Sequence, residues 1–597
     1  MQILHTDIAI IGGGGAGLRA AIAAAQTDPN CKISLLSKVY PMRSHTVAAE
    51  GGAAAVTLGH DSLQAHFDDT VAGSDWLADQ DVVDYFVSHA YDELVQLERW
   101  GCPWSRRDDG SVLVRRFGGM KTERTWFAAD KTGFHILHTL FQTSLQFANI
   151  ARLDEFFVLD LLVAEQQIAG VLAMQLSTGQ LYQIQAKSVI LATGGAGRVF
   201  HYNTNGGIVT GDGMALAYRH GVALRDMEFV QYHPTGLPGS GILITEASRG
   251  EGGILLNKDG YRYLQDYGLG PETPLGKPEN KFMELGPRDK LSQAFWHEQQ
   301  KGRTGNYGEH AVVYLDLRHL GSSYLNERLP FICELAKSYV NVDPAKALIP
   351  IRPAVHYTMG GILTDGQCQT SIAGLYAIGE CASVGLHGAN RLGSNSLTEL
   401  LVFGKVAGVA AVAHAKQSKT LPVSALNGQS QQLQHQLQAR FGAKQSESVA
   451  SLRKAMTLAM EQGCGIYRTT EGMQQCLTTL QQLKQRYQQL QISDHSRIFN
   501  YELLQHYELG FGLDVAEAMC ASALARQESR GAHQRLDQGM QSRNDTDYLQ
   551  HSIAQLMPET AGAAGGSANI SYQPVRITKS TPAARLYGDA ANKQEPV

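Results

Sequence analysis

The sequence lacks closely spaced cysteines. Its eight cysteines are spread along 597 residues, and no two of them have CxxC spacing. Without that spacing we expect neither an iron–sulfur cluster nor a zinc site within this chain, and we predict no metal ligands. A secreted protein of this length would more often pair its cysteines, so their scatter favours a reducing compartment. The cysteines are Cys31, Cys102, Cys333, Cys368, Cys381, Cys464, Cys476 and Cys520.

The sequence also lacks an excess of positive charge and a long apolar run. The net charge is −5, whereas nucleic-acid-binding surfaces show an excess of Lys and Arg, so we expect no nucleic acid partner. No apolar run reaches the roughly 18 residues that span a bilayer; the nearest, "LLVFGKVAGVAAVA", is short and contains Lys405. The N-terminus has no basic stretch, so we expect no signal peptide. If the protein works at a membrane, another chain must hold it there.

What is present is a globular composition with clustered glycine. Hydrophobic residues make up 43% and charged residues 18%, which allows a large buried core. The 62 glycines exceed the usual share of about 7%. Because much of this glycine lies in motifs, we expect backbone that approaches a ligand closely.

The N-terminal segment "DIAIIGGGGAGLRAAIAAAQ" predicts a buried strand, a glycine turn and an Ala-rich helix. With the following strand "KISLLSK" it forms a βαβ unit, and Gly12, Gly14 and Gly17 have the GxGxxG spacing of a dinucleotide site. These glycines permit a tight turn and close approach of a pyrophosphate to the helix N-terminus. The second strand ends in Ser37 and Lys38 instead of the acidic residue that binds the ribose of NAD. That weakens an NAD interpretation and leaves FAD open.

The chain predicts an α/β fold with several parts. Two later strand–turn segments, "AKSVILATGGAGRVF" and "GLYAIGECASVGLHGANRLG", are expected to return to the first sheet, so the dinucleotide-binding domain is discontinuous, at 1–235 and 353–415. The insert 236–352, with strands such as "AVVYLDLR", forms an α+β cap. Helical spacing with Gln-rich faces predicts a helical bundle over 416–550. A small C-terminal segment, 551–597, holds a linker, a last strand "SYQPVRITKS" and a disordered tail after Tyr587.

Eight segments, spread in order from residue 1 to about 590, resemble one family. The chain is similar to the flavoprotein subunits of fumarate reductase and succinate dehydrogenase. The resemblance implies a Rossmann-like FAD domain with FAD bound covalently through the 8α-methyl group to His45, in "RSHT". The matching segments are "GGGGAGLRAA", "SKVYPMRSHTVAAEGG", "NTNGGIVTGDGMALAYRHG", "MEFVQYHPTG", "TEASRGEGG", "GPRDKLSQA", "HYTMGGI" and "GECASVGLHGANRLGSNSL". A neutral imidazole is a nucleophile, and an ordinary histidine pKa near 6.5 leaves much of His45 neutral at pH 7.

The resemblance also implies the remaining FAD contacts. The glycine turn faces the pyrophosphate, Ser37 and Lys38 lie near the adenosine ribose, and Glu380 accepts a ribityl or ribose hydroxyl. The other expected contacts border the flavin or take polar parts of FAD. The full set is Gly12, Gly14, Gly15, Ala16, Gly17, Ser37, Lys38, Ser44, His45, Thr46, Glu50, Gly51, Gly52, Asp212, His356, Tyr357, Glu380, Arg391, Ser394, Ser396 and Leu397.

The reaction that the resemblance implies is reduction of fumarate, a dicarboxylate alkene, by a hydride and a proton. Two carboxylates need cations or hydrogen-bond donors, and Arg–carboxylate pairs are among the strongest such contacts. The family places His233, Thr245, His356 and Arg391 around these carboxylates. Ordinary pKa values would select His233 or His356 as the acid, since the best acid has a pKa near the working pH. The family instead assigns Arg288, with Arg249 and Glu246 relaying protons from solvent.

The direction of the reaction depends on a smaller signal. Glu50, in "AAEGG", is typical of fumarate reductases, where succinate dehydrogenases tend to have Gln. A carboxylate there would disfavour added negative charge on the flavin by Coulomb repulsion. We therefore expect fumarate reductase, with succinate dehydrogenase as the alternative. L-Aspartate oxidase, a relative that lacks the "RSHT" histidine, is the weaker alternative.

The resemblance finally implies partners for anaerobic respiration. Since no iron–sulfur or haem motif is present, electrons would come from an iron–sulfur subunit. That subunit would be joined to membrane anchor subunits that oxidise menaquinol. The chain would then lie at the cytoplasmic face of the inner membrane, held there by its partners.

Overall fold

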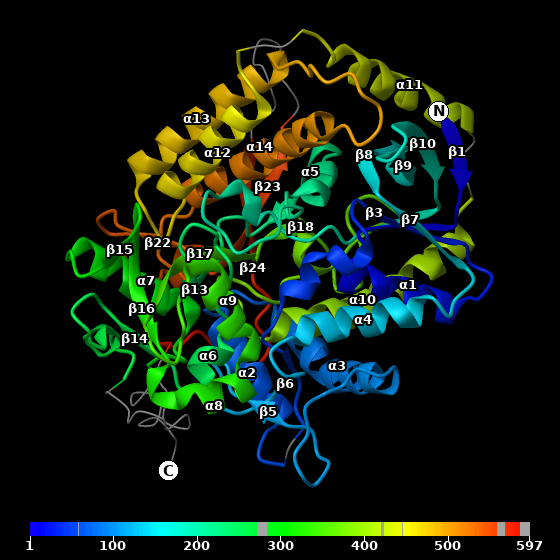
Figure 1. Cartoon of the computed structure of the whole chain (residues 1–597). Coiled ribbons are helices and arrows are strands. Elements are labelled where there is room, and N and C mark those ends of the chain that lie inside the picture. Colours follow the sequence, from blue (N-terminus) through cyan, green and yellow to red (C-terminus); the bar gives the residue numbers. More distant parts are fainter. Residues whose placement is uncertain (58, 271–282, 420–422, 444–445, 558–567, 586–597) are drawn as a thin grey trace.

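The computed structural model describes residues 1–57, 59–270, 283–419, 423–443, 446–557 and 568–585 (Figure 1). Its centre is a parallel five-stranded sheet in the order β19–β11–β2–β3–β7. β2, the predicted apolar strand, pairs with β3 on one side and with β11 on the other. The late strand β19 pairs with β11, which confirms that the chain returns to its first sheet. The strands are β2 (Ile8–Ile11), β3 (Ile33–Ser37), β7 (Ile150–Asp154), β11 (Ser188–Leu191) and β19 (Leu375–Ala377).

Two buried helices, α1 (Gly15–Thr27) and α10 (Asn395–Gln417), pack directly on each other. A Cβ at Gly408 would lie 2.5 Å from the Ala20 carbonyl oxygen, so this glycine allows the two backbones to approach closely. Among the described residues, α10 is the one helix long and apolar enough to cross a membrane, although the sequence predicted none. Its strongest window is 67% buried, because α10 packs against α1 and α3 as a core helix. Beside this pair lie α2 (Leu63–Gly73), α3 (Gln80–Arg99) and α4 (Thr132–Ser144).

Three smaller sheets extend the central domain. One runs β1–β10–β9–β8, a second β20–β18–β12–β23–β24, and a third β4–β6–β5. The predicted last strand is β24, which pairs antiparallel with β23, whereas the expected linker and tail lie largely outside the described residues. The bounds are β1 (Gln2–His5), β4 (Ala53–Ala54), β5 (Val114–Arg115), β6 (Thr125–Trp126), β8 (Phe156–Ala164), β9 (Gln167–Gln175), β10 (Gln180–Gln185), β12 (Leu224–Arg225), β18 (Gly361–Leu363), β20 (Ala382–Ser383), β23 (Gln550–Leu556) and β24 (Ala568–Pro574).

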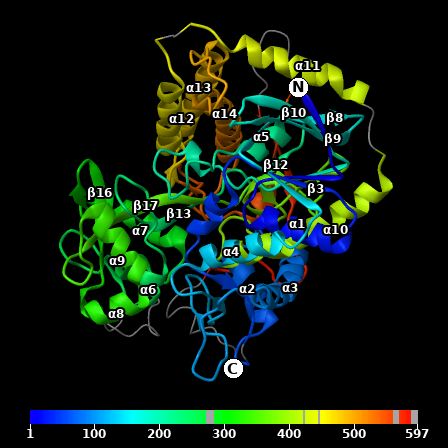
Figure 2. The ribbon, with the colours of Figure 1, turned by 45° about the vertical axis from the view of Figure 1, so that its right-hand side comes forward.

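The insert forms a separate lobe beside the central domain (Figure 2). Its sheet runs β13–β17–β16–β14, with β15 added to β16, and all its pairings are antiparallel. β13 and β17 both reach across the expected edges of the insert and carry several of the expected site residues. The elements are β13 (Val230–Gly236), α6 (Ala247–Gly250), β14 (Ile254–Leu256), α7 (Arg288–Gln300), β15 (Gly305–Tyr307), β16 (His310–Asp316), α8 (Gly321–Arg328), α9 (Pro330–Val340) and β17 (Ile349–Thr358).

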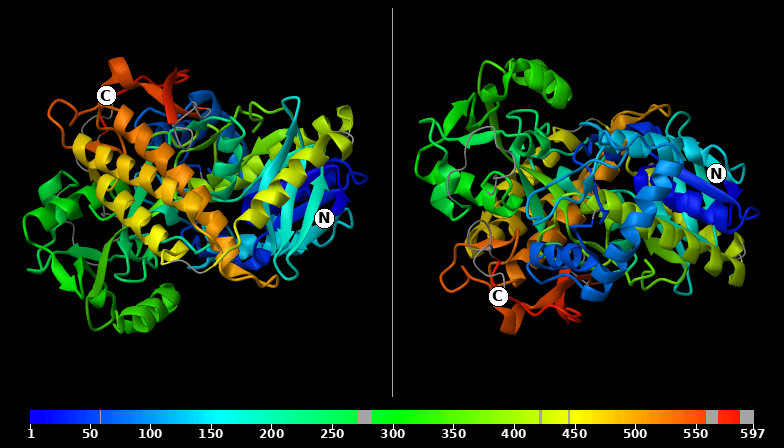
Figure 3. Two further views of the ribbon diagram at one scale, coloured as in Figure 1. Left: turned by 90° about the horizontal axis from the view of Figure 1, so that it is seen from above. Right: turned by 90° about the horizontal axis from the view of Figure 1, so that it is seen from below.

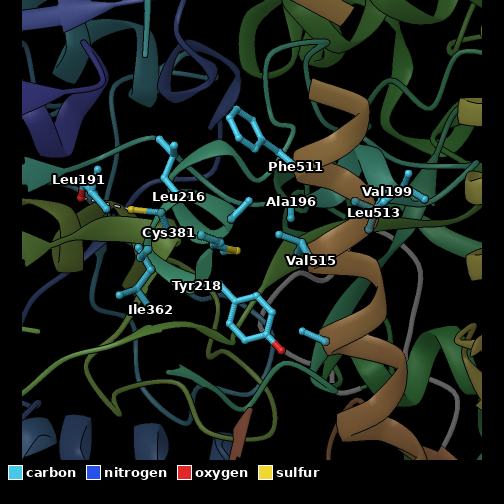
Figure 4. Packing of buried hydrophobic residues seen from close by; sticks show 14 of the residues in the cluster. Leu191, Ala196, Val199, Leu216, Tyr218, Ile362, Cys381, Phe511, Leu513 and Val515 are labelled. Atoms are coloured by element: carbon cyan, nitrogen blue, oxygen red, sulfur yellow. Dashed lines mark hydrogen bonds between the residues drawn. The ribbon is translucent and has the colours of Figure 1, made fainter. Parts of the chain in front are cut away.

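Within the expected bundle 416–550, α12, α13 and α14 lie side by side (Figure 3), whereas α11 packs on β8. A shared apolar core joins α14 to the central domain: Phe511, Leu513 and Val515 from α14 face Val199 and Leu216 (Figure 4). α11 crosses above β8 and the N-terminus. The bounds are α5 (Asp212–Arg219), α11 (Val423–Ala439), α12 (Val449–Gly463), β21 (Tyr467–Arg468), α13 (Thr470–Gln489), α14 (Tyr501–Ala525), β22 (Gln534–Arg535) and α15 (Asp545–Tyr548).

Candidate active site

The glycine turn between β2 and α1 has the geometry that a pyrophosphate needs. Gly12 has φ +121°, and a Cβ there would overlap the Ala192 carbonyl oxygen, so only glycine fits this turn. A Cβ at Gly17 would overlap the Gly12 carbonyl oxygen, which shows how closely the helix packs on the turn. α1 begins at Gly15 with no acidic residue in its first turn. Its N-terminus is therefore suited to an anion.

A cavity, here named the central cavity, opens at the carboxyl ends of the parallel strands. It brings together most of the expected FAD residues from segments that are distant in sequence. Those that line it are Gly12, Gly14, Gly15, Ala16, Ser37, Lys38, Ser44, His45, Thr46, Asp212, His356, Tyr357, Glu380, Arg391, Ser396 and Leu397. Gly17, Glu50, Gly51, Gly52 and Ser394 are expected contacts that do not line it.

His45 starts a short 3-10 helix at the wall of the central cavity. The Gly206 N–H donates a hydrogen bond to His45 Nδ1 over 3.3 Å, so Nε2 is the ring nitrogen available for a further bond. Burial lowers the pKa of His45 to about 4, and the imidazole is therefore neutral at pH 7. The neutral form is the nucleophilic one that attachment of a flavin requires.

Polar groups at the other end of the central cavity suit the adenosine half of a dinucleotide. Lys38 Nζ donates to Asp212 Oδ2 over 2.7 Å and to Glu508 Oε1 over 2.9 Å. Glu380 accepts the Thr358 N–H over 3.0 Å, and burial raises its pKa to about 7. The Ser44 hydroxyl is buried and has no hydrogen-bond partner among the described residues. Together with the glycine turn, this unsatisfied donor fits a bound FAD.

A second group of residues, here named the cationic cluster, adjoins the central cavity and comprises His233, Arg288, His356, Arg391 and Gln231. The Gln231 side-chain oxygen accepts from Arg288 Nη1 and from Arg391 Nη2, both over 3.1 Å. The rings of His233 and His356 have centroids 5.1 Å apart. His356 and Arg391 line the central cavity, so the cluster begins where that cavity ends. Two guanidinium groups and two imidazoles at one place can bind a dicarboxylate.

Glu246 links the two arginines on the cap side of the cationic cluster. Arg288 Nε donates to Glu246 Oε2 over 2.9 Å, and Arg249 Nη2 lies 3.6 Å from the same oxygen. Burial alone would raise the pKa of Glu246, but the charges of Arg288 and Arg249 and the Gly118 N–H hold it below its ordinary value. Burial lowers the pKa of Arg249. Thr245 is buried directly before Glu246. The expected relay residues are therefore in contact.

The two imidazoles of the cationic cluster are unsuited to act as cationic acids. Burial, with the charge of Arg288 next, lowers the pKa of both His233 and His356 well below the ordinary value. His356 Nδ1 shares a hydrogen bond with the Thr204 hydroxyl over 2.9 Å. Both rings are neutral at pH 7, so the choice of acid from ordinary pKa values was wrong for this environment.

Glu50 differs from its expected role. It is buried, it does not line the central cavity, and burial, followed by the nearby charge of Asp130, raises its pKa well above the ordinary value. Arg115 and Lys131 offset this only in part. This shift favours the neutral carboxyl group, whereas the Coulomb argument for direction requires the charged one.

Two side chains near the site were missed by the sequence reasoning. Gln231 lies two residues before His233 on β13, and strand alternation puts both on one face, so that spacing could have revealed it. Glu399 accepts from the Tyr357 hydroxyl over 3.0 Å and contacts His387 Nε2 over 2.8 Å. Arg391 lies over the Tyr357 ring, 4.3 Å from its centroid. No sequence pattern marks Glu399, because it lies within an apolar helix.

Expected site residues at the start of α10 are also ordered by contacts. Ser396 Oγ accepts from Arg391 Nη1 over 2.9 Å. Ser394 has φ +66°, and its carbonyl accepts the Ala54 N–H over 3.1 Å, while its buried hydroxyl has no partner among the described residues. Gly51 and Gly52 pack against Phe117 and Trp126, away from the cavity wall.

Comparison with known proteins adds two family models and close relatives. Residues 7–397 match a model described as "FAD binding domain", and residues 453–587 match one described as "Fumarate reductase flavoprotein C-term". The chain is 64% identical to the fumarate reductase flavoprotein subunit of Proteus vulgaris, over 100% of this chain and 98% of the relative. It is 40% identical to the succinate dehydrogenase flavoprotein subunit of Rickettsia bellii, over 98% of this chain and 99% of the relative. A solved quinol–fumarate reductase with menaquinol molecules contains a chain with a TM-score of 0.95 and 63% identity, covering 98% of this chain and 100% of that one.

Proposed function

The chain belongs to the family of fumarate reductase flavoproteins, and from this premise we propose that it is the flavoprotein subunit that reduces fumarate to succinate. The observation that carries this proposal is the cationic cluster at the end of a dinucleotide cavity. The cavity is suited to FAD and the cluster to a dicarboxylate, and His356 and Arg391 belong to both. Identity of 64% to a fumarate reductase subunit, against 40% to a succinate dehydrogenase subunit, favours the reductase.

FAD is held by the glycine turn at its pyrophosphate and by His45 at its flavin, through a covalent bond from the imidazole to the 8α-methyl group. FAD, when bound, supplies a hydride to one alkene carbon of fumarate. The neutral state of His45 and its Nδ1 contact with Gly206 support attachment through Nε2. Ser44, Lys38 and Glu380 provide polar contacts along the rest of the cofactor.

The substrate carboxylates are bound by Arg391, His233, His356 and Thr245. The neutral imidazoles donate hydrogen bonds, and Arg391 adds positive charge, which its contacts with Gln231 and Ser396 hold in place. A polarised carboxylate stabilises the negative charge that moves onto the substrate in the transition state. The site is buried, so these contacts act in an environment of low dielectric constant.

Arg288 delivers the proton to the second alkene carbon, and Glu246 with Arg249 restores it. The contacts of Glu246 with both guanidinium groups support this order. An arginine is a weak acid toward water, yet it can protonate a strongly basic carbon held against it. The low pKa values of His233 and His356 support the assignment, since neither ring holds a second proton at pH 7.

Electrons reach this chain from an iron–sulfur subunit during anaerobic respiration. That subunit receives them from membrane anchor subunits, which oxidise menaquinol. The solved assembly with menaquinol molecules supports this arrangement. The protein then lies at the cytoplasmic face of the inner membrane and is held there by its partners. The chain itself contains the flavin and substrate sites.

Two parallel initial rates test the function on one membrane preparation. Fumarate reduction is followed with a reduced viologen and succinate oxidation with a dye acceptor. A ratio of reduction to oxidation well above one supports the proposal. A ratio well below one makes the chain a succinate dehydrogenase subunit. If neither rate exceeds background, the substrate assignment fails, and an L-aspartate oxidase type of reaction would be tested next.

A further inference from the structure

Three cysteines of the helical bundle meet at one point in its core. Cys464 caps the C-terminus of α12, Cys476 lies on α13 and Cys520 lies on α14. Their Sγ atoms all lie within 4.8 Å of one another. The spacings of 12 and 44 residues match no metal-binding motif, so no metal ligand is expected here from the sequence. Only the packing of the three helices brings the sulfur atoms together.

A fourth sulfur atom adjoins this cluster. Met460 Sδ lies 3.8 Å from Cys476 Sγ, and Met460 is itself fully buried. Sulfur atoms bound to one tetrahedral metal at about 2.3 Å would lie slightly less than 4 Å apart, which is close to this separation. No histidine or carboxylate joins the group of candidate ligands among the described residues. The donor set is therefore soft throughout.

The printed contacts of the three thiols are few. Cys476 Sγ donates to Met460 Sδ over 3.8 Å, and Cys520 Sγ donates to the Met473 carbonyl oxygen over 3.3 Å. A thiolate is the form of cysteine that binds metals. All eight cysteines are unpaired, so the thiols are available as ligands.

We propose that Cys464, Cys476 and Cys520, with Met460 as a weaker fourth donor, bind one Cu(I) ion. Thiolate and thioether sulfur is the donor set that Cu(I) prefers, whereas structural Zn(II) sites use cysteine and histidine. On binding, the three S–H bonds break, three S–Cu bonds form, and three protons pass to the solvent. No electrons are exchanged, so the step needs no oxidant.

A bound ion would fasten the three helices of the bundle to one another. α14 also packs against α5, and Glu508 on α14 contacts Lys38 at the wall of the central cavity. The cysteines themselves do not line that cavity. The site is thus expected to act on stability and not on turnover. Because the three side chains are at most 3% exposed, the ion must enter during folding or when the bundle opens.

Metal analysis of the intact complex tests this proposal. The complex is produced in medium with added copper or with added zinc, purified without oxygen, and analysed for metal per chain. About one copper per chain is expected after growth with copper. Cys464→Ser and Cys476→Ser are expected to reduce it to background, whereas Cys333→Ser, a buried cysteine of the cap, keeps it. Thermal unfolding of the loaded wild type should occur at a higher temperature than that of metal-free protein.

A measurement on unmodified protein guards against variants that fail to fold. X-ray absorption at the copper edge should show a first shell of sulfur only, and Met460→Leu should speed the loss of copper to a chelator. Four results would overturn the proposal: no bound metal, zinc in place of copper, nitrogen or oxygen in the first shell, or copper retained by the Cys464 and Cys476 variants. The first of these would mean that the thiols serve only as small apolar side chains in the core.

Discussion

Replacing Arg288 with lysine separates binding from proton transfer. Arg288 donates to Glu246 through Nε and to Gln231 through Nη1, and its Nη2 lies 2.9 Å from Glu246 Oε2, so its planar fork has contacts at three points. Lysine keeps the charge but loses the fork, and it can reach at most part of these acceptors. General acid catalysis contributes about 10²- to 10⁴-fold to rate. We therefore expect kcat for fumarate reduction to fall by at least about 10²-fold, or about 2.7 kcal/mol.

The assay for this variant measures rate and binding separately. Viologen-linked reduction gives kcat, and the change in flavin absorbance on adding succinate gives the dissociation constant. The latter should stay within about tenfold of wild type, or about 1.4 kcal/mol, because the charge remains. Arg318→Lys is the matched control, since Arg318 is 47% exposed and forms its ion pair with nearby Asp316. Wild-type turnover in Arg288→Lys would refute a proton role for Arg288.

Three further predictions concern the cofactor and the core. His45→Ser should remove the fluorescent flavin band from a denaturing gel while FAD still binds the folded protein, because the cavity remains; a persistent band would place the linkage elsewhere. Gly12→Ala should abolish FAD binding, measured as flavin per purified chain, because its Cβ overlaps Ala192, whereas Gly366→Ala, which meets nothing within 4 Å, should retain it. Burial lowers the pKa of His506 from 6.5 to about 4. The contribution of the neutral ring to the free energy of unfolding is therefore present above pH 6.5 and is lost as the pH falls toward 4. Between pH 7.5 and 5 the free energy of unfolding should fall by about 2 kcal/mol through this group. In denaturant titrations, His506→Phe should make that fall smaller by the same amount. A fall of unchanged size in the variant would contradict this prediction.

The sequence was sufficient for features that local pattern determines. The apolar run before Gly12 and the Ala-rich segment after it predicted the strand, turn and helix of the cofactor site. The return of β19 to the first sheet followed from a second buried strand that ends in glycine. Helical spacing likewise predicted α12, α13 and α14.

Features that depend on tertiary environment could not be predicted from the sequence. The pKa values of His233 and His356 are lowered by desolvation and by charges far along the chain, and desolvation raises the pKa of Glu50. Ordinary pKa values contain neither effect. Lys38 donates a hydrogen bond to Glu508, which is 470 residues away in the sequence, and no local pattern predicts that contact. α10 is apolar because it is packed on several sides, and the sequence alone showed only an interrupted run.

The central claim is that this chain holds both the flavin and the site where fumarate is reduced. Its most direct test is rapid mixing of the pre-reduced complex with fumarate, followed by flavin absorbance. We predict that reoxidation of the flavin occurs within a turnover, saturates with fumarate, and slows at least about 10²-fold in Arg288→Lys. Reduced flavin that persists when fumarate is in excess, or reoxidation that Arg288→Lys leaves unchanged, would contradict the account.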